Sequence, residues 1–239
     1  MTSRNSDTRA STPVPLAGDQ VELRSADGHV LAAYRVRPAE TPLGGLVVLQ
    51  EIFGVNRHIR EVCDGYAKDG FSVVSPALFD RVAPGTELGY DADSIATGRR
   101  LRAAIAWEKT LLDVQAAIDS VRSDGPVAVV GYCWGGTLAF LAATRLEGLA
   151  CAVSYYGGQT VPFANETPRV PVLMHFGEHD PRIPERDRNI ILQANPQIEA
   201  HLFPADHGFN CDHREAFHAP SAQRARALTL NFINRHIQQ

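Results

Sequence analysis

Three polar side chains in this 239-residue chain have the types and the order of a nucleophile, an acid and a base. Cys133 lies in the segment Gly-Tyr-Cys-Trp-Gly-Gly, and Asp180 and His207 follow it along the chain. A thiol beside an imidazole that a carboxylate orients is an arrangement for nucleophilic catalysis. The chemistry that these residues predict is attack of a thiolate on a carbonyl carbon, followed by hydrolysis of the acyl-enzyme.

The segment around Cys133 has the spacing of a strand-to-helix turn that exposes a nucleophile. The apolar run 126–130 predicts a buried strand, and the small residues of 137–143 predict a helix after the turn. Gly131 and Gly135 lack a Cβ where the chain segments crowd. The helix start favours a thiolate and a developing oxyanion through its free N–H groups. The alternative interpretation is a buried cysteine in a glycine-rich turn.

Asp180 and His207 each follow a predicted strand, as the acid and base of such a site require. Because the carboxyl ends of parallel strands meet at one edge of a sheet, both loops are expected beside Cys133. His179 adjoins Asp180 and is the second candidate for the base. We expect His175, inside an apolar strand, to be a core residue, and Asp206 to cap its loop.

Strands and helices alternate along the chain, which predicts an α/β fold with a mostly parallel central sheet and helices on both faces. Alternating apolar and polar residues predict an antiparallel hairpin near the N-terminus. Its strands are expected at 18–24 and 29–36, and the others at 45–49, 71–76, 126–130, 150–156, 170–177 and 198–203. Helices are expected at 57–69, 95–122 with one interruption, from the turn to about 148, 184–194 and 219–237.

These motifs together resemble the dienelactone hydrolase family of α/β-hydrolases, over roughly residues 18–237. The resemblance rests on the segments at 50–56, 83–86, 131–136 and 155–157 and on the loops that carry Asp180 and His207. It implies the α/β-hydrolase fold and hydrolysis of an ester or lactone without a cofactor. Metal-dependent hydrolysis is the poorer interpretation, because the chain has no histidine or paired-carboxylate spacing of that kind.

The resemblance also implies roles for residues outside the triad. Glu51 matches a glutamate that helps to activate the cysteine, although a carboxylate at a helix entry is the alternative. The backbone N–H groups of Ile52 and Trp134 match the two oxyanion-hole donors. Arg81 matches one of two arginines that hold a substrate carboxylate, for which a planar guanidinium is suited.

The chain departs from the family pattern after His207. The second arginine is expected four residues after this histidine, where the chain has Cys211, and the nearest arginine is Arg214. The serine expected directly after the histidine is Gly208. Half of the carboxylate clamp is therefore missing, so the pattern does not imply dienelactone itself as the substrate. We expect Cys211 to be a packed loop residue rather than a second nucleophile.

Composition limits the partners of the protein. A net charge of −4 gives no reason to expect nucleic acid or an anionic membrane, and no apolar stretch approaches the roughly 20 residues of a membrane span. We expect a disordered tail over 1–17, a single domain over 18–239 and a monomer or small homo-oligomer. The widely spaced cysteines, Cys63, Cys133, Cys151 and Cys211, are expected to be free thiols in a cytoplasmic protein.

The sequence leaves two other functions open. A general carboxylesterase or thioesterase would use the same fold and nucleophile, and dependence of activity on a substrate carboxylate would separate it. A non-catalytic thiol-sensing module would form a sulfenic acid at Cys133 but no acyl-enzyme.

Overall fold

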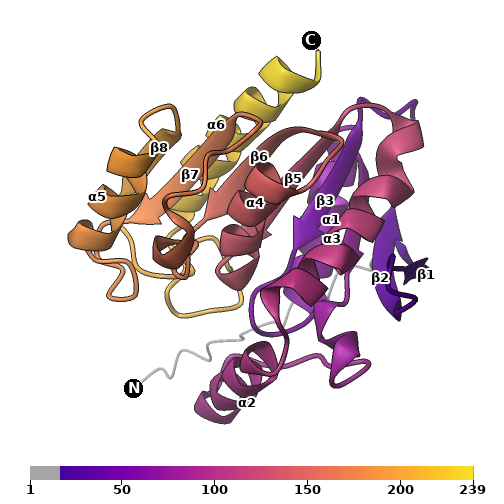
Figure 1. The fold of residues 1–239 in the computed structure, drawn as a ribbon, viewed down its shortest axis with the longest axis horizontal. Helices are drawn as coiled ribbons and strands as arrows, with labels where there is room; N and C mark the ends of the chain where they lie inside the picture. The colour runs from indigo at the N-terminus through magenta and orange to yellow at the C-terminus, as the bar shows by residue number, and fades with distance from the viewer. Residues whose placement is uncertain (1–16, 239) are drawn as a thin grey trace, which may run out of the picture.

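The computed structural model describes residues 17–238, which form an eight-stranded sheet between layers of helices (Figure 1). The strand order is β1-β2-β4-β3-β5-β6-β7-β8. β2 is antiparallel to both of its neighbours, and every other neighbouring pair is parallel. The strands are β1 Asp19–Arg24, β2 Val30–Val36, β3 Gly45–Leu49, β4 Ser72–Pro76, β5 Val127–Tyr132, β6 Leu149–Tyr155, β7 Val172–Gly177 and β8 Glu199–Phe203.

The helices lie where the sequence predicts them, except that the second begins at residue 92 instead of 95 and the fourth ends at residue 145 instead of about 148. They are α1 Arg57–Lys68, α2 Ala92–Ala103, α3 Trp107–Val121, α4 Trp134–Arg145, α5 Glu185–Ala194 and α6 Ala219–Ile237, with 3₁₀ turns at Leu78–Arg81, Arg122–Asp124 and Val161–Phe163. The expected interruption lies between α2 and α3. α2 begins earlier than expected because the Asp91 side chain caps it, accepting a 2.9 Å hydrogen bond from the Ser94 N–H. The α/β-hydrolase fold with a mostly parallel sheet is confirmed.

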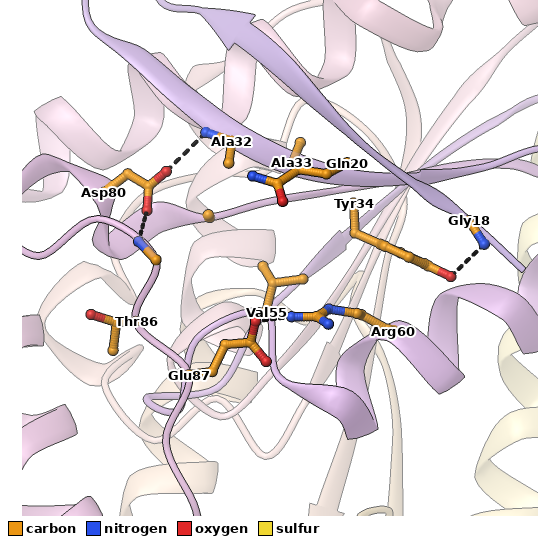
Figure 2. Close-up of a pocket in the computed structure, with 12 residues that line it drawn as sticks. Gly18, Gln20, Ala32, Ala33, Tyr34, Val55, Arg60, Asp80, Thr86 and Glu87 are labelled. Atoms are coloured by element: carbon orange, nitrogen blue, oxygen red, sulfur yellow. Dashed lines mark hydrogen bonds and ion pairs between the residues drawn. The ribbon is translucent and has the colours of Figure 1, made fainter. Parts of the chain in front are cut away.

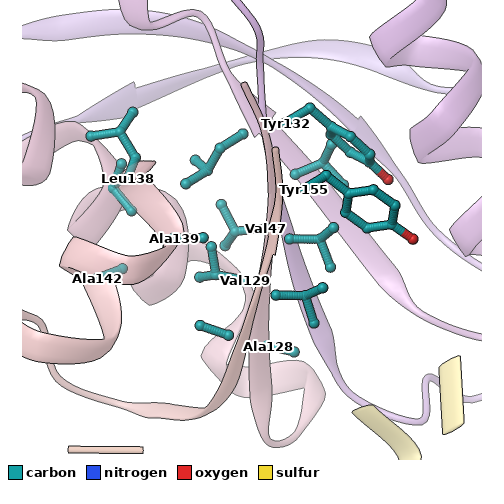
Figure 3. Close-up of a cluster of buried hydrophobic side chains, with 14 of the residues drawn as sticks. Val47, Ala128, Val129, Tyr132, Leu138, Ala139, Ala142 and Tyr155 are labelled. Atoms are coloured by element: carbon teal, nitrogen blue, oxygen red, sulfur yellow. The ribbon is translucent and has the colours of Figure 1, made fainter. Parts of the chain in front are cut away.

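The central strands β3 and β5 are buried along their whole length, because helices cover both faces of the sheet. Tyr132 and Tyr155 project from one face, and α4 packs on the other (Figure 3). The tyrosine face is covered by α1 and α6: the Tyr132 hydroxyl lies 3.3 Å from that of Tyr66, and the Tyr155 hydroxyl lies 2.8 Å from the Thr229 hydroxyl. This packing fixes the strand ends from which the site is built.

The carboxyl ends of four parallel strands bring the candidate residues to one edge of the sheet. Glu51 follows β3, Cys133 follows β5, Asp180 follows β7 and His207 follows β8. α2 lies away from the two helical layers and beside the loops at this edge (Figure 1). The edge therefore carries both the predicted triad and a helix that can shape a pocket above it.

The expected N-terminal tail falls almost wholly outside the described residues. Ala17 is described, and its N–H donates a 2.9 Å hydrogen bond to the Asp64 carboxylate. Within residues 17–238, no helix combines the length and the apolar character that crossing a bilayer requires.

Candidate active site

The structure brings the three predicted triad residues into contact. The Cys133 sulfur lies 3.1 Å from Nε2 of His207, and Nδ1 of the same ring lies 2.7 Å from Oδ2 of Asp180. The other Asp180 oxygen accepts a 2.8 Å hydrogen bond from the Arg182 backbone N–H, which fixes the carboxylate. Asp180 and His207 are buried, and Cys133 is half-buried. The order thiol–imidazole–carboxylate is the geometry that nucleophilic catalysis requires.

Cys133 sits on a strained turn. Its backbone has φ 54° and ψ −112°, a conformation that costs a non-glycine residue about 1–3 kcal/mol. Close chain contacts hold it there: a Cβ on Gly131 would lie 1.8 Å from the Gly135 carbonyl oxygen, and one on Gly135 would lie 2.3 Å from the Leu49 oxygen. The Cys133 N–H also donates to the Tyr155 carbonyl at 3.0 Å. The glycines thus permit the sharp strand-to-helix turn that the sequence predicts.

The charges around His207 favour its protonated form. Burial alone would lower the pKa of this imidazole, because desolvation penalises the cation. The charge of the Cys133 sulfur, together with hydrogen bonds to Asp180 and Cys133, outweighs burial and raises the pKa of His207 to about 9. At neutral pH this ring therefore keeps its proton, which makes His207 the candidate acid of the site.

A pocket is lined by Cys133 and His207 together with Ile52 and Trp134. Trp134 is the first residue of α4, so its N–H has no acceptor within the helix. Ile52 lies in the turn that follows β3. The two residues expected to supply the oxyanion-hole N–H groups therefore line the same pocket as Cys133, from the turn after β3 and from the start of α4.

Glu51 and Arg214 form a buried ion pair next to this pocket. Nη1 of Arg214 lies 3.2 Å from Oε1 of Glu51, whose side chain is 2% exposed. The second Glu51 oxygen is buried and has no hydrogen-bond partner among the described residues. Arg214 and His207 also line one adjoining pocket. A carboxylate with one free oxygen is thus held close to the triad.

The conformation of the loop after His207 explains both departures from the family pattern. A Cβ on Gly208 would lie 2.4 Å from Nη1 of Arg214, so glycine leaves the space that this guanidinium fills. Cys211 is fully buried, as expected of a packed loop residue. Position matching along the sequence identified Arg214 only as the nearest arginine, because the fold of the loop determines which arginine reaches the site.

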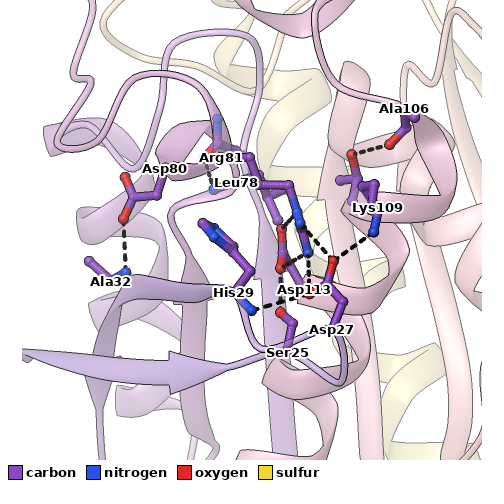
Figure 4. A network of polar contacts seen from close by, with 12 residues as sticks. Ser25, Asp27, His29, Ala32, Leu78, Asp80, Arg81, Ala106, Lys109 and Asp113 are labelled. Atoms are coloured by element: carbon purple, nitrogen blue, oxygen red, sulfur yellow. Dashed lines mark hydrogen bonds and ion pairs between the residues drawn. The ribbon is translucent and has the colours of Figure 1, made fainter.

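Arg81 does not line the Cys133 pocket but lies in a separate ion-pair network (Figure 4), which corrects the sequence-based expectation. Its guanidinium donates to both oxygens of Asp113, at 2.6 and 2.7 Å, and to Asp27 at 3.1 Å. Asp113 is fully buried on α3, so its charge requires this partner. The carboxylate-binding role expected for Arg81 is therefore dropped.

Other arginines line the pocket instead. Arg99 and Arg102 come from α2, and Arg182 comes from the loop that follows Asp180. Sequence analysis missed all three. The only available signal was the position of Arg182 two residues after a predicted triad member, since nothing in the sequence shows that α2 lies over the sheet edge.

A second pocket contains none of the triad residues. It lies between β2 and residues 85–87, and Figure 2 shows contacts from Asp80, Tyr34 and Arg60 to neighbouring residues. Asp80 accepts from the Ala32 and Gly85 N–H groups, and Arg60 pairs with Glu87. We assign no chemistry to it.

One cluster in the described part of the chain has the composition of a metal site. The ligand atoms of His58, Asp212 and His213 lie within 4.8 Å of one another. Burial lowers the pKa of His58, but a hydrogen bond to Asp212, with a contact to Cys211, outweighs it and raises the pKa to about 10. The proton on His58 competes with a metal ion at neutral pH. We therefore propose no metal there.

Comparisons with known proteins identify the family of this chain. Residues 31–237 match a family model described as the dienelactone hydrolase family. A carboxymethylenebutenolidase of Pseudomonas putida is 35% identical over 224 residues, which cover 89% of this chain and 94% of the relative. A putative carboxymethylenebutenolidase of Escherichia coli K12 is 31% identical over 232 residues, 88% of this chain and 84% of the relative.

Solved structures give the same picture. The crystal structure of a putative dienelactone hydrolase from Klebsiella pneumoniae superposes with a TM-score of 0.79 at 28% identity, covering 90% of this chain and 98% of that one. A dienelactone hydrolase-like promiscuous phosphotriesterase from metagenomic libraries, 20% identical over 92% of this chain and 99% of that one, has a TM-score of 0.71 and shares the fold.

Proposed function

The chain belongs to the dienelactone hydrolase family and is a hydrolase of ester or lactone bonds, and we propose that it acts through an acyl-enzyme on Cys133. The observation that carries the proposal is the Cys133–His207–Asp180 relay, with its 3.1 and 2.7 Å contacts, on a strained turn beside a pocket. Glu51, Ile52 and Trp134 complete the proposed site.

In the first half-reaction, the Cys133 thiolate attacks the carbonyl carbon of the substrate. The N–H groups of Ile52 and Trp134 stabilise the oxyanion that forms on the carbonyl oxygen. The intermediate then expels the alkoxide or enolate, which takes the proton from the His207 imidazolium. The products are a free alcohol or enol, a thioester on Cys133 and a neutral His207.

In the second half-reaction, neutral His207 acts as the base. Acylation removes the negative charge of the sulfur, which is the largest influence that raises the pKa of His207. Burial then favours the neutral ring. His207 accepts a proton from water, the resulting hydroxide attacks the thioester, and the thiolate leaves as the carboxylic acid is released. Asp180 orients the ring through both steps.

Glu51 is proposed to assist formation of the thiolate. Its unpartnered oxygen is available to accept a proton when substrate weakens the pairing with Arg214. The same contacts therefore link substrate binding to activation of the nucleophile.

The leaving tendency of a thiolate bears on the substrate class. Because thiolate leaves more readily than most alkoxides, the cycle favours activated esters such as enol lactones and aryl esters. A general carboxylesterase or thioesterase with the same residues is the alternative. We further propose a cytoplasmic location, in which the four free thiols stay reduced.

Pre-steady-state hydrolysis of a neutral aryl ester tests the proposal. We expect a burst of phenol equal to the enzyme concentration, and an acyl adduct on the peptide that contains Cys133 by mass spectrometry. Cys133→Ala is expected to reduce kcat/KM by about 10³-fold or more, whereas Cys211→Ala retains activity. Glu51→Gln slows the burst but not the steady state after it. Full turnover by Cys133→Ala would contradict the mechanism.

A further inference from the structure

We propose that Tyr156 is a positioning residue of the reaction, whose hydroxyl donates to Glu51 when this carboxylate leaves Arg214. The hydroxyl replaces the hydrogen bond that Glu51 loses and keeps the carboxylate in the site. The inference rests on the proposed function, because it concerns activation of the same nucleophile. Tyr156 does not line the Cys133 pocket, so it acts through Glu51 and not on the substrate.

The backbone of Tyr156 is strained in the same way as that of the nucleophile. Within residues 17–238, Cys133 with φ 54° and Tyr156 with φ 39° are the only non-glycine residues that have a positive φ. Such a conformation is costly for a bulky residue and persists only where the surrounding contacts determine it. The Tyr156 N–H donates to the His175 carbonyl at 2.8 Å, and the Cys133 N–H donates to the Tyr155 carbonyl at 3.0 Å. The two strained residues therefore follow neighbouring strands, β5 and β6, and are held by backbone hydrogen bonds.

The ring of Tyr156 packs against the triad. It is fully buried, and its centre lies 5.1 Å from that of the His207 imidazole and 5.4 Å from that of the Phe209 ring. Rings in such contacts prefer defined relative orientations, so the packing fixes the direction of the side chain. Turning the hydroxyl towards solvent would break the contact with His207.

The hydroxyl of Tyr156 is buried and has no hydrogen-bond partner in the described chain. Most buried hydroxyls in proteins are paired, so an unpaired one calls for an explanation. Burial and the charge of Glu51 raise the pKa of Tyr156 well above its usual value, so the group keeps its proton and is a donor. Of the neighbouring charges, that of Glu51 has the largest effect on it. An unused donor therefore lies near a carboxylate.

Glu51 has the matching requirement. Its Oε1 is held by Arg214 at 3.2 Å, while Oε2 is buried without a partner among residues 17–238. When the pairing with Arg214 weakens, the buried carboxylate needs another donor, because an unpaired buried charge is costly. The Glu51 charge also acts on Tyr90, but the Tyr90 hydroxyl already pairs with Asn56 at 3.0 Å. Tyr156 is therefore the tyrosine whose hydroxyl is available to Glu51.

Tyr156→Phe removes the hydroxyl and keeps the ring. Because the hydroxyl has no partner before Glu51 moves, we expect the variant to be at least as stable as the wild type in urea unfolding. Release of phenol from a neutral aryl ester in a single turnover, with enzyme in excess, is expected to slow by about tenfold or more, because a hydrogen bond to a charged group is lost. An unchanged rate of phenol release would overturn the inference.

A double variant tests whether Tyr156 acts through Glu51. Once Glu51→Gln has removed the charged acceptor, the hydroxyl has little left to contribute. We therefore expect the combination of Tyr156→Phe and Glu51→Gln to release phenol about as fast as Glu51→Gln alone. Effects that multiply would show that the two residues act independently, which would also overturn the inference.

Tyr155→Phe is the matched control, because it removes the neighbouring buried hydroxyl, which lies 2.8 Å from that of Thr229. It is expected to lose stability and to keep its rate of phenol release, the opposite of Tyr156→Phe. A loss of stability in Tyr156→Phe as large as in the control would mean that its hydroxyl is only structural. If the two substitutions are coupled but Cys133→Ala still hydrolyses the ester, the acyl-enzyme mechanism fails and the pairing of Tyr156 with Glu51 stands.

Discussion

His207 has a proton affinity that depends on the charge of the sulfur beside it. The charge of the Cys133 sulfur raises the pKa of the imidazole while burial lowers it, so in the proposed mechanism the ring is an acid before acylation and a base after it. His207 thus supplies both the proton for the leaving group and the base that activates water. The charge of the Cys133 sulfur determines which of the two it supplies.

The coupling predicts the titration of His207 in variants. Removing a negative charge beside an imidazolium destabilises the charged ring, so Cys133→Ala is expected to lower the pKa of His207 below its value of about 9. Asp180→Asn should lower it for the same reason. Proton NMR titration of the His207 ring measures both shifts, with Cys211→Ala as the control. An unchanged midpoint in Cys133→Ala would show that the sulfur carries no charge.

α2 shapes the site through a close contact with the turn after β3. A Cβ on Gly98 would lie 2.0 Å from the carbonyl oxygen of Ile52, so only glycine lets the helix approach so closely. The same contact places Arg99 and Arg102 over the pocket. One glycine therefore couples the proposed oxyanion donor Ile52 to the helix that lines the pocket.

Gly98→Ala tests this coupling. Replacing glycine by alanine inside a helix ordinarily stabilises it by roughly 1 kcal/mol, but here the methyl group must displace either α2 or the Ile52 turn. We expect kcat/KM to fall by about tenfold or more, with far-ultraviolet circular dichroism unchanged. Ala96→Ser, an exposed change in the same helix, serves as the control. Wild-type kinetics in Gly98→Ala would mean that the contact is not needed.

At the scale of the whole molecule, a buried charge network holds the hairpin β1–β2 to the rest of the domain. Arg81 joins Asp27, in the turn of the hairpin, to Asp113 on α3 (Figure 4). Ser25 also donates to Asp113. The Arg81 guanidinium therefore links three segments that are far apart in the sequence. This structural role explains the arginine at this position without a contact between Arg81 and substrate.

Arg81→Gln is expected to reduce stability and to spare catalysis. Removing one partner of a buried ion pair leaves the other uncompensated, at a cost of about 3 kcal/mol or more. Urea unfolding should show this loss, and kcat/KM for an anionic ester should stay at the wild-type value under folding conditions. Lys109→Gln removes only an exposed contact with Asp27 and should have a much smaller effect. A selective loss of activity on anionic esters in Arg81→Gln would restore its expected role.

The sequence alone predicted the strands, the helices, the turn around Cys133 and the order of the triad, because these depend on local periodicity and on short spacings. Parallel strands meet at one edge, so the proximity of Cys133, Asp180 and His207 followed from the element order. The positions of the arginine side chains did not follow from the element order. The position of a guanidinium on a long side chain depends on the counter-charges, aromatic rings and cavities within its reach. These features are formed by segments that are distant in the sequence. Tertiary structure alone directed Arg81 to Asp113, folded Arg214 over Gly208 and left Arg102 unpaired beside the nucleophile.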